Sequence, residues 1–452
     1  MQSFLKENGY VWDSGVSGHY TYGPQGTALK KSIENRLRQA FDANDFSEIS
    51  TPLLLHKDVW VRSGHWDKFR DPVVYTKAKK MLRLDHLIEE SCTEEFTSLS
   101  FERICEILTE YNQQAEDPVV IPEQMLYRDL MMRCQSGNQD VGLRPETATA
   151  TYNNFQELFI FYNKQFPIRV YQIGKSFRNE INPRNGVIRG REFTQAEFQV
   201  ILPVEQKSAR EFDYSRLLAI PITGRSLEID EWRELPSEYA YYILFTYNLF
   251  RKLGIPYERI RIRRHAEDER AFYALDAWDI EVDLTGLGWT EIAGIHDRGA
   301  YDLRHSKFKK AIPHIIEIAI GVDRLFYSIL DTLYDNKTEQ EGKTILKIPY
   351  SIAPITVAVY PVVRTNQKIV EVAQDIYGKL KVVFNTEYNE KQSIGRRYLK
   401  AAIKGIPLCI TVDTQTLEDD TVTIRDRNTE NQDRVKVGEL INEILLRKMS
   451  WT

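Results

Sequence analysis

Two neighbouring stretches decide the fold: Phe177-Arg178-Asn179-Glu180 and Arg191-Glu192-Phe193-Thr194-Gln195-Ala196-Glu197. They read as two β-strands joined by the turn-rich residues 181–186. Because strand side chains alternate between faces, the arginine and glutamate of the first stretch share one face. The phenylalanine, the glutamine and the last glutamate of the second stretch share another. A packed core does not tolerate such mixed charges without partners. A ligand with phosphates, an aromatic base and an amine, such as an aminoacyl-adenylate, would supply them.

The length and composition of the chain predict at least two globular domains. It has 452 residues, of which 42% are hydrophobic, enough for more than one core. No apolar run is long enough to cross a bilayer, and Lys6 and Glu7 interrupt the apolar residues at the N-terminus. We therefore expect a cytoplasmic protein. The four cysteines (Cys92, Cys105, Cys134 and Cys409) form no Cys-x-x-Cys pair, which favours reduced thiols over disulfides or a zinc site.

The net charge of −5 neither indicates nor excludes a nucleic-acid partner, because phosphate contacts depend on local patches. Three basic patches stand out, at residues 259–264, 307–310 and 391–404. Each alone is more often a solvated face than a binding site.

The pattern before residue 340 predicts an α+β domain built on antiparallel strands. Inserted helical segments are expected at about 87–140 and 203–258. The other expected elements are a helix at 27–42, a strand at 49–54, the strand pair of 168–202, a helix at 237–253, a hairpin at 278–292, a loop at 294–299, and a strand at 314–320 that runs into a helix at Gly321.

The pattern changes after a polar, linker-like segment at residues 335–342. Strands and helices then alternate, which predicts a small α/β domain over residues 345–452. Its expected elements are strands at 355–360, 381–384 and 406–412, helices at 365–379 and 394–403, and two short strands at 421–425 and 434–437.

Single side chains in the first domain suit a nucleotide. The guanidinium of Arg178 suits an α-phosphate, whose charge grows when a carboxylate attacks it. Phe193 can stack on a base, and Glu197 can pair with an ammonium group. Arg324 lies in the first turn of a predicted helix, where anions bind. Glu291 is either a solvent-facing residue or a magnesium ligand.

Taken in order along the chain, these motifs resemble those of the class II aminoacyl-tRNA synthetases, and their residues are similar to those of the homodimeric glycyl-tRNA synthetases. The residues that carry the resemblance are Tyr22-Gly23-Pro24-Gln25-Gly26, Arg144-Pro145-Glu146-Thr147-Ala148, the strand pair, Gly288-Trp289-Thr290-Glu291, Gly294-Ile295-His296-Asp297-Arg298, Gly321-Val322-Asp323-Arg324, Gln392-Ser393-Ile394-Gly395-Arg396-Arg397-Tyr398 and residues 416–427. The resemblance implies an antiparallel-sheet catalytic domain followed by an anticodon-binding domain. It also implies a homodimer formed through the helix at 27–42 and the segment at 49–54.

The resemblance further implies ATP with Mg²⁺, glycine and tRNA(Gly) as ligands, and particular contacts for each. ATP would contact Arg178, Asn179, Glu180, Ile188, Arg189, Phe193, Glu291, Ile292, Gly321 and Arg324. Of these, Arg178, Arg324 and Glu291 would be catalytic, and Glu291 would bind magnesium. Glycine would contact Arg83, Glu146, Phe193, Gln195, Glu197, Arg298, Glu317, Ala319 and Gly321. The tRNA would contact Arg396, Arg397 and Lys400.

The chain departs from the family pattern at three places. Glu317-Ile318-Ala319 stands where the family commonly has Glu-Pro-Ser, and Thr149-Ala150 stands where it has Gln-Gly. Residues 77–80 hold no cysteine, so no zinc is expected.

The sequence leaves two alternatives to a glycine–tRNA ligase. One is a synthetase-like nucleic-acid-binding accessory protein that does not activate an amino acid. Retention of Arg178, Glu180, Phe193 and Arg324 speaks against it. The other is the same chemistry with alanine or serine, which only Ala319 favours.

Overall fold

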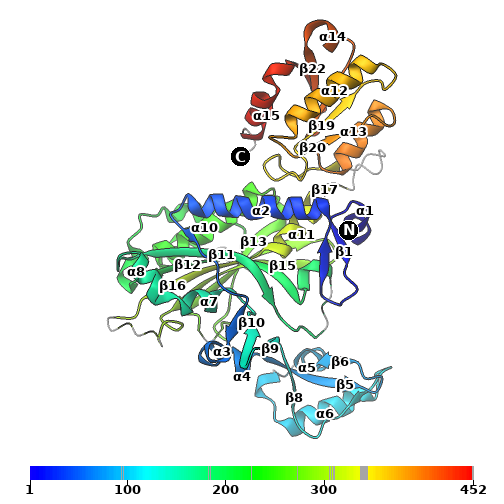
Figure 1. Ribbon diagram of the computed structural model, residues 1–452. Coiled ribbons are helices and arrows are strands. Elements are labelled where there is room, and N and C mark those ends of the chain that lie inside the picture. The colour runs from blue at the N-terminus through cyan, green and yellow to red at the C-terminus, as the bar shows by residue number, and fades with distance from the viewer. Residues whose placement is uncertain are drawn as a thin grey trace.

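A seven-stranded sheet forms the centre of the molecule (Figure 1). The computed structural model describes all residues except 93, 95, 182, 184, 225–226, 272, 305, 307, 309–310, 336–344 and 450–452. The strands lie in the order β13 (Ile260–Arg264), β14 (Asp276–Leu284), β15 (Gly288–Gly299), β16 (His314–Gly321), β12 (Glu192–Leu202), β11 (Ile168–Phe177) and β3 (Ser47–Glu48). Only β3 and β11 of this sheet pair in parallel. The predicted α+β class with an antiparallel sheet is confirmed.

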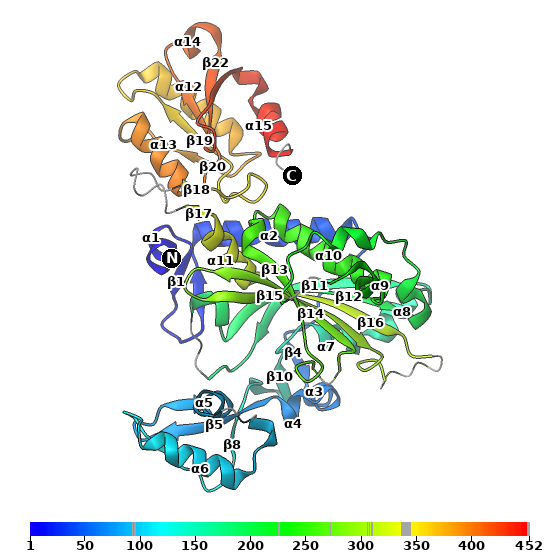
Figure 2. The ribbon, with the colours of Figure 1, turned by 180° about the vertical axis from the view of Figure 1, so that it is seen from behind.

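Three helices cover one face of this sheet: α2 (Pro24–Asp42), α10 (Ser237–Lys252) and α11 (Val322–Leu333). Helix α2 begins with proline at its first position, where the missing N–H costs nothing. Its residues Leu29, Ile33, Leu37 and Phe41 recur at helical spacing, and all four are fully buried. They join the core that contains the even-numbered residues of β12. Figure 2 shows α2, α10 and α11 together over the sheet.

The opposite face of β12 carries the odd-numbered residues, so the predicted alternation places Phe193, Gln195 and Glu197 on one face. Two helices, α7 (Ala148–Asn153) and α8 (Phe155–Phe161), pack on part of this face around Ile201 and Ile315. A small sheet adjoins them, in the order β4 (Leu54–His56), β10 (Gln139–Leu143) and β9 (Arg133–Ser136). The short helices α3 (Lys57–Ser63) and α4 (His65–Lys68) come directly after β4 in the chain.

The predicted helical insert at 87–140 is only half helical. It holds α5 (Leu84–Ser91), the single turn η1 (Phe96–Ser98) and α6 (Phe101–Asn112), but its second half forms strands. These are β7 (Val119–Val120) and β8 (Leu126–Asp129), which pair with β5 (Arg70–Thr76), itself paired with β6 (Met81–Arg83). The error arises because these strands pair with residues outside the window, and local periodicity does not report such partners. In Figure 1 the insert lies at the opposite end of the molecule from the C-terminal unit.

Two further predictions for the N-terminal unit are wrong. The strand expected at 49–54 does not form: residues 49–53 connect β3 to β4 without regular structure, and the backbone carbonyl of Thr51 accepts from the buried Arg144. The loop expected at 294–299 is part of β15, which runs without a break from the hairpin to Gly299. Glycines suggested a loop there, yet Gly294 is paired with Ala319 in the middle of the sheet.

The described part of residues 203–258 holds short helical turns and one long helix, separated by irregular residues. The helical elements are η3 (Val204–Ser208), η4 (Tyr214–Leu217), α9 (Ile229–Arg233), α10 and η5 (Tyr257–Arg259). At the N-terminus, α1 (Gln2–Glu7) precedes a hairpin of β1 (Val11–Asp13) and β2 (Tyr20–Tyr22). The turn η2 (Gly186–Arg189) lies between β11 and β12.

The C-terminal unit is a five-stranded sheet in the order β20 (Thr386–Tyr388), β19 (Val357–Pro361), β21 (Leu408–Val412), β22 (Thr421–Asp426) and β23 (Gln432–Lys436). The first three strands are parallel and the last two are antiparallel. Its helices are α12 (Gln367–Leu380), α13 (Ile394–Ile403), α14 (Thr416–Asp419) and α15 (Leu440–Met449), with the turn η7 (Val437–Glu439). The strand expected at 381–384 is wrong: these residues turn out of α12, and the strand follows at 386.

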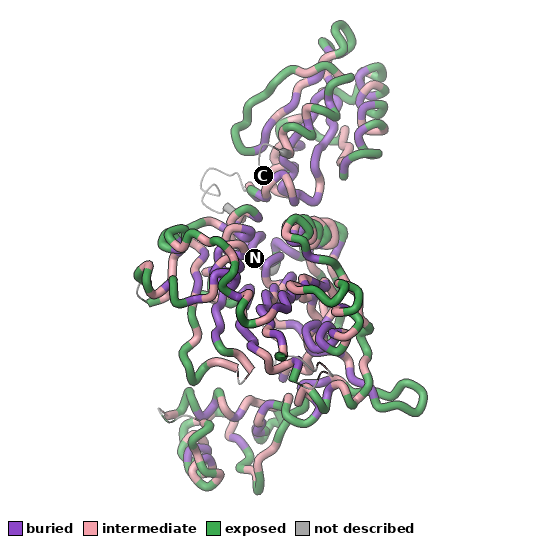
Figure 3. Tube along the Cα trace, turned by 90° about the vertical axis from the view of Figure 1, so that its left-hand side faces the viewer, coloured by how far each residue is buried: buried purple, intermediate pink, exposed green. Residues whose placement is uncertain are grey.

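The two units have separate cores, visible as two groups of buried residues in Figure 3. The expected boundary near 340 lies outside the described residues and stays a prediction. The short strands β17 (Tyr334–Asp335) and β18 (Ile345–Leu346) flank it. Leu346, Ile348 and Ile352 pack in the core of the N-terminal unit rather than with β19. The chain therefore leaves that core only after residue 353.

Candidate active site

A cavity of about 160 Å³ lies where β12, β15 and β16 meet the start of α11. Nine of the ten residues expected at ATP line it: Arg178, Glu180, Ile188, Arg189, Phe193, Glu291, Ile292, Gly321 and Arg324. Gln195 and Ala319, expected at glycine, line it too. The tenth residue, Asn179, lies elsewhere, because its backbone N–H donates to Leu130 and its side chain contacts Asp129.

The arginines of this cavity are held by protein acceptors. The Nε of Arg178 donates to the carbonyl of Pro145 at 3.0 Å, and its guanidinium lies 5.6 Å from the ring centre of Phe193. Arg189 pairs with Glu180 at 2.8 Å, and Arg324 pairs with Glu291 at 3.1 Å. Burial opposes ionisation of Glu291, but Arg324 outweighs it, so the pKa of that carboxyl is lowered. Both pairs present cations beside carboxylates that a bound anion could displace.

Gln195 contributes a polar atom without a partner. Its Oε1 is buried and accepts no hydrogen bond within the described part of the chain. Since an unmade hydrogen bond on a buried acceptor is costly, the geometry suits a ligand that donates a proton there.

Next to this cavity, three glutamates and one arginine are buried together: Glu146, Glu197, Glu317 and Arg298. They arrive from four places, since Glu146 precedes α7, Glu197 lies on β12, Arg298 on β15 and Glu317 on β16. Arg298 donates to both oxygens of Glu317, at 3.0 and 3.1 Å, and to Asp302 at 2.7 and 2.9 Å. The side chains of Arg298 and Glu317 are each 4% exposed. The pair is therefore fixed before any ligand arrives.

Glu317 has further partners. The hydroxyl of Tyr152 lies 2.9 Å from Oε2, Gln199 donates to the same atom at 3.1 Å, and Nδ1 of His296 lies 3.1 Å from Oε1. Although burial opposes ionisation, Arg298 and His296 outweigh it and lower the pKa of Glu317. This carboxylate is charged throughout the physiological range.

Glu197 is the least compensated member of the cluster. It accepts one short hydrogen bond, at 2.5 Å, from the hydroxyl of Thr147. Burial, followed by the charges of Glu317 and Glu146, raises its pKa to about 8. A cation bound beside Glu197 would lower this pKa again, because an opposite charge favours the ionised carboxylate.

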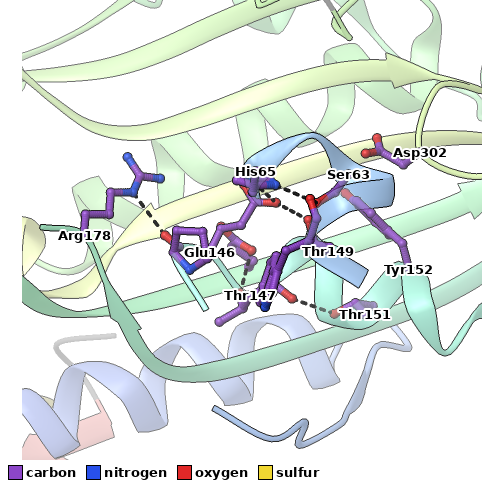
Figure 4. Close-up of polar contacts among 12 residues, drawn as sticks. Ser63, His65, Glu146, Thr147, Thr149, Thr151, Tyr152, Arg178 and Asp302 are labelled. Atoms are coloured by element: carbon purple, nitrogen blue, oxygen red, sulfur yellow. Dashed lines mark hydrogen bonds and ion pairs between the residues drawn. The ribbon is translucent and has the colours of Figure 1, made fainter. Parts of the chain in front are cut away.

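Glu146 has a hydroxyl and a ring beside it. Thr149 donates to Oε1 at 2.6 Å, and Nε2 of His65 lies 3.7 Å from the same oxygen (Figure 4). Burial opposes ionisation here as well, but His65 and then Arg298 lower the pKa of Glu146 below its ordinary value.

Other site predictions fare differently. Arg83 lies on β6 of the insert, where it pairs with Asp85 and, at 3.5 Å, with Asp71. Glu180, which lines the cavity, acts on it electrostatically, so Arg83 lies nearer to the cavity than to the glutamate cluster.

The three residues expected at tRNA do not share a surface. Arg396 and Lys400 are exposed on one face of α13, one helical turn apart. Arg397 is wrong as a tRNA contact, because it is 2% exposed and donates to the carbonyls of Pro361, Asn389 and Val362. A run of basic residues on a helix necessarily turns some of them inwards.

Sequence reasoning missed several contacts: those of His65, Thr147, Tyr152, Gln199 and Asp302. Gln199 continues the odd-numbered series of β12 beyond Glu197, so the alternation could have found it. Thr147 stands in the quoted run 144–148, but its bond to Glu197 was not expected, and the contacts of His65, Tyr152 and Asp302 had no local signal. It also missed Gly174, which leaves room for the buried Arg144: a Cβ there would lie 2.2 Å from the guanidinium. Arg144 donates to Lys175, Thr51 and Gln172 and so holds the segment before Glu146.

Among the described residues, no group of three or more His, Cys, Asp or Glu side chains is placed to hold a metal ion. The expectation of no zinc stays a prediction. No described helix is both long and apolar enough to cross a bilayer.

Known proteins resemble the chain in both units. A family profile described as "tRNA synthetase class II core domain (G, H, P, S and T)" matches residues 132–220, and one described as "Anticodon binding domain" matches residues 356–447. Among solved structures, prolyl-tRNA synthetase of Giardia lamblia in complex with prolyl-adenylate is similar in fold, with a TM-score of 0.65 and 15% identity. It covers 100% of this chain and 79% of that one. The RNA binding domain of threonyl-tRNA synthetase from Cryptosporidium parvum has a TM-score of 0.63 and 18% identity, covering 98% and 97%.

Relatives that align over nearly the whole chain identify the family more closely than the domain profiles do. Glycine–tRNA ligase of Thermococcus gammatolerans is 31% identical, over 98% of this chain and 97% of its own length. Those of Pyrococcus horikoshii and Methanocaldococcus jannaschii are 32% and 30% identical, over 97% and 98% of this chain and 96% and 97% of their own lengths. With its class II core, its anticodon-binding unit and this full-length similarity, the chain belongs to the glycine–tRNA ligase family.

Proposed function

We propose that this protein joins glycine to tRNA(Gly) at the expense of ATP. The observation that carries the proposal is the position of the glutamate cluster beside the arginine-lined cavity. One side of the site can hold phosphates and a base, and the other can hold an ammonium group. The distance between them is short, since Gln195 lines the cavity and Glu197 is two residues further along the same strand.

For ATP we assign the roles by charge and shape. Arg178 would bind the α-phosphate, and Arg189 and Arg324 would bind the distal phosphates after releasing Glu180 and Glu291. Phe193 would stack on adenine, and the freed Glu180 would accept from its exocyclic amine. Ile188, Ile292 and Gly321 would close the walls of the cavity.

Glu291 fits a magnesium ion that arrives with ATP. Its side chain is about half exposed, and its carboxylate lines the cavity beside Arg324. Magnesium in such sites is usually held by one or two carboxylates together with substrate phosphates. The ion would neutralise charge on the leaving pyrophosphate, and Arg324 would bind the same group through its guanidinium.

For glycine, the glutamates supply the recognition. Glu197 and Glu146 would bind the ammonium group. Glu317 would add a third negative charge to the pocket, and its pairing with Arg298 would keep its carboxylate in position. Arg298 is already bonded to Glu317 and Asp302 through all three of its nitrogens, so we assign it a positioning role. A pocket that identifies an amino acid without a side chain must use the charged ends and leave no space for a methyl group.

The reaction needs no covalent nucleophile from the protein. A carboxylate oxygen of glycine attacks the α-phosphorus of ATP, the bond to the β-phosphate bridging oxygen breaks, and pyrophosphate leaves. A terminal ribose hydroxyl of the tRNA then attacks the carbonyl carbon of the adenylate, and AMP leaves with the electron pair. Arg178 stabilises the charge that develops in the first step, and the carboxylates keep glycine in line.

The remaining assignments concern partners. Arg396 and Lys400 would contact the tRNA backbone from α13. We propose a homodimer formed through α2 and the segment that includes Leu53 and Leu54, which are 41% and 39% exposed. Sedimentation of the wild type and of Leu53→Glu tests this, since a charge in a homodimer interface should yield monomers. The cytoplasmic location stays a prediction.

One assay tests the function: ATP–pyrophosphate exchange with glycine, run beside alanine and serine. We expect exchange with glycine alone. Faster exchange with alanine or serine would overturn the glycine assignment and implicate Ala319, whose small side chain lines the cavity. Absence of exchange with all three would favour the accessory protein.

A further inference from the structure

His65 lies at a sharp reversal of the chain beside the glutamate cluster. It begins α4 directly after Gly64, which ends α3 in the left-handed conformation with φ 85°. That conformation suits glycine because it has no Cβ. Figure 4 places His65 next to Glu146 and Ser63, on a chain segment separate from α7 and β12.

The imidazole of His65 lies between two aromatic rings and two polar neighbours. Its ring packs edge-on against Trp60 and Phe69, with ring centres 5.7 and 5.5 Å away. Nδ1 lies 2.8 Å from the hydroxyl of Ser63, and Nε2 lies 3.7 Å from Oε1 of Glu146. The two ring nitrogens thus face two different partners, and the Ser63 contact sets the ring orientation.

Glu146 is held on one oxygen alone. Thr149 and His65 both approach Oε1, and within the described residues no hydrogen bond reaches Oε2. A carboxylate has room for several donors, so the second oxygen can serve a ligand. The order of contacts is Ser63, His65, Glu146 and then the pocket.

We propose that His65 is a positioning residue for the amino-acid pocket: together with Thr149 it holds Oε1 of Glu146, so that Oε2 is directed to the ammonium group of glycine. The proposal rests on the proposed function. His65 touches no reacting atom, and it acts through Glu146.

The same segment connects His65 to the other half of the site. Phe69 lies against His65 and also under the guanidinium of Arg178, at 5.6 Å. Because α4 leads directly into β5, the strand with which β7 and β8 of the insert pair, the segment that carries His65 continues into the element that supports the insert.

The test uses three substitutions at His65 in the full chain. His65→Leu fills the space between Trp60 and Phe69 but removes both polar contacts. His65→Asn keeps a donor near Ser63 but does not reach Glu146, whereas the longer amide of His65→Gln can. For Leu and Asn we expect the KM for glycine in pyrophosphate exchange to rise about tenfold or more, with the KM for ATP changed less than about twofold. His65→Gln should restore the KM for glycine to within about threefold of wild type.

His56→Leu is the matched control. His56 caps α3, the helix that precedes His65, because its ring accepts a hydrogen bond from the backbone N–H of Asp58; its side chain is 46% exposed, and among the described residues it makes no contact with Glu146. It should leave both KM values unchanged. Thermal unfolding of each variant separates loss of fold from loss of positioning.

A thermodynamic cycle with Glu146→Gln gives the decisive readout. Binding of a glycyl-sulfamoyl-adenosine analogue is measured by calorimetry for wild type, each single variant and the double variant. If His65 acts through Glu146, adding His65→Leu to Glu146→Gln should weaken binding no further. Additive losses, equal rises in both KM values, or an unchanged KM for glycine in His65→Leu would each overturn the proposal. Failure of wild type to exchange pyrophosphate with glycine would instead overturn the proposed function.

Discussion

The hydroxyl of Thr147 lies 2.5 Å from Oε2 of Glu197, and both side chains are buried. This bond is the main compensation for a carboxylate that burial and two neighbouring glutamates oppose, which is why its pKa rises to about 8. Ionised Glu197 is therefore unfavourable until a cation binds beside it. Its presence lowers the stability of the folded protein and favours binding of a cation.

Glu197→Gln should stabilise the fold at alkaline pH and abolish use of glycine. Folded Glu197 keeps its proton up to about pH 8, whereas the unfolded chain releases it near 4.5. Between these values the folded state binds more protons, so this residue makes the protein less stable as pH rises. The neutral amide removes that cost, on the order of a few kcal/mol at pH 8.5 and little at pH 4.5. Thermal unfolding at both values checks it, and equal effects at the two pH values would contradict it.

The KM for glycine should fall as pH rises from 6.5 to about 8.5. Glycine's ammonium group requires ionised Glu197, whose pKa in the free protein is about 8. Below that value, binding must first expel a proton, so affinity falls about tenfold per pH unit at most. The measurement is pyrophosphate exchange against glycine concentration at fixed ATP. A KM independent of pH would show that Glu197 is not the ammonium ligand.

Arg178→Ala should reduce pyrophosphate exchange by about a hundredfold to a thousandfold, because it removes a donor aimed at developing charge. The affinity for tRNA, measured by filter binding, should change little. Arg233→Ala is a suitable control, since Arg233 is exposed on α9 and pairs with Asp230. A collapse of tRNA affinity in Arg178→Ala would contradict the division of labour between the two units.

Neighbouring arginines on α13 should respond in opposite ways. Arg396→Ala and Lys400→Ala should weaken tRNA binding and each reduce its salt dependence by about one unit of slope, with stability unchanged. Arg397→Ala removes a buried donor to three carbonyls and should destabilise the C-terminal unit by about 2 kcal/mol or more. Urea unfolding and binding at several salt concentrations separate the two effects. If Arg396→Ala unfolds the unit, the assignment of its face is wrong.

Truncation should begin after residue 355. Leu346, Ile348 and Ile352 belong to the catalytic core, so a deletion from 345 would open that core. Removal of 356–452 should reduce aminoacylation of tRNA far more than pyrophosphate exchange. Equal losses in both assays would contradict an anticodon-reading role for the C-terminal unit.

Local patterns predicted much of the chain because they have short periods. The alternation in β12 places Phe193, Gln195 and Glu197 on one face, and the structure agrees. The spacing of Leu29, Ile33 and Leu37 predicts α2, and α13 has the predicted bounds of 394 and 403. The family motifs were readable for the same reason, since each is a short contiguous run.

Predictions failed where the partner of a segment is distant in sequence. Strands β7 and β8 were expected to be helical because their partner β5 lies outside the window. Arg397 was expected at a surface because its basic neighbours are there, yet its acceptors on residues 361 and 389 are folded against it.

The sequence by itself determined the antiparallel hairpin, the order of the motifs and the residue types that can meet an adenylate, because strand and helix periods are local properties. Tertiary structure alone decided how the charges compensate one another. It paired Arg298 with Glu317 and placed the hydroxyl of Thr147 as a hydrogen-bond donor to Glu197. It also brought His65 next to Glu146 from a separate helix. The physical reason is that a pKa and a side-chain orientation depend on burial and on neighbours within a few ångströms, and such neighbours come together only when the chain folds.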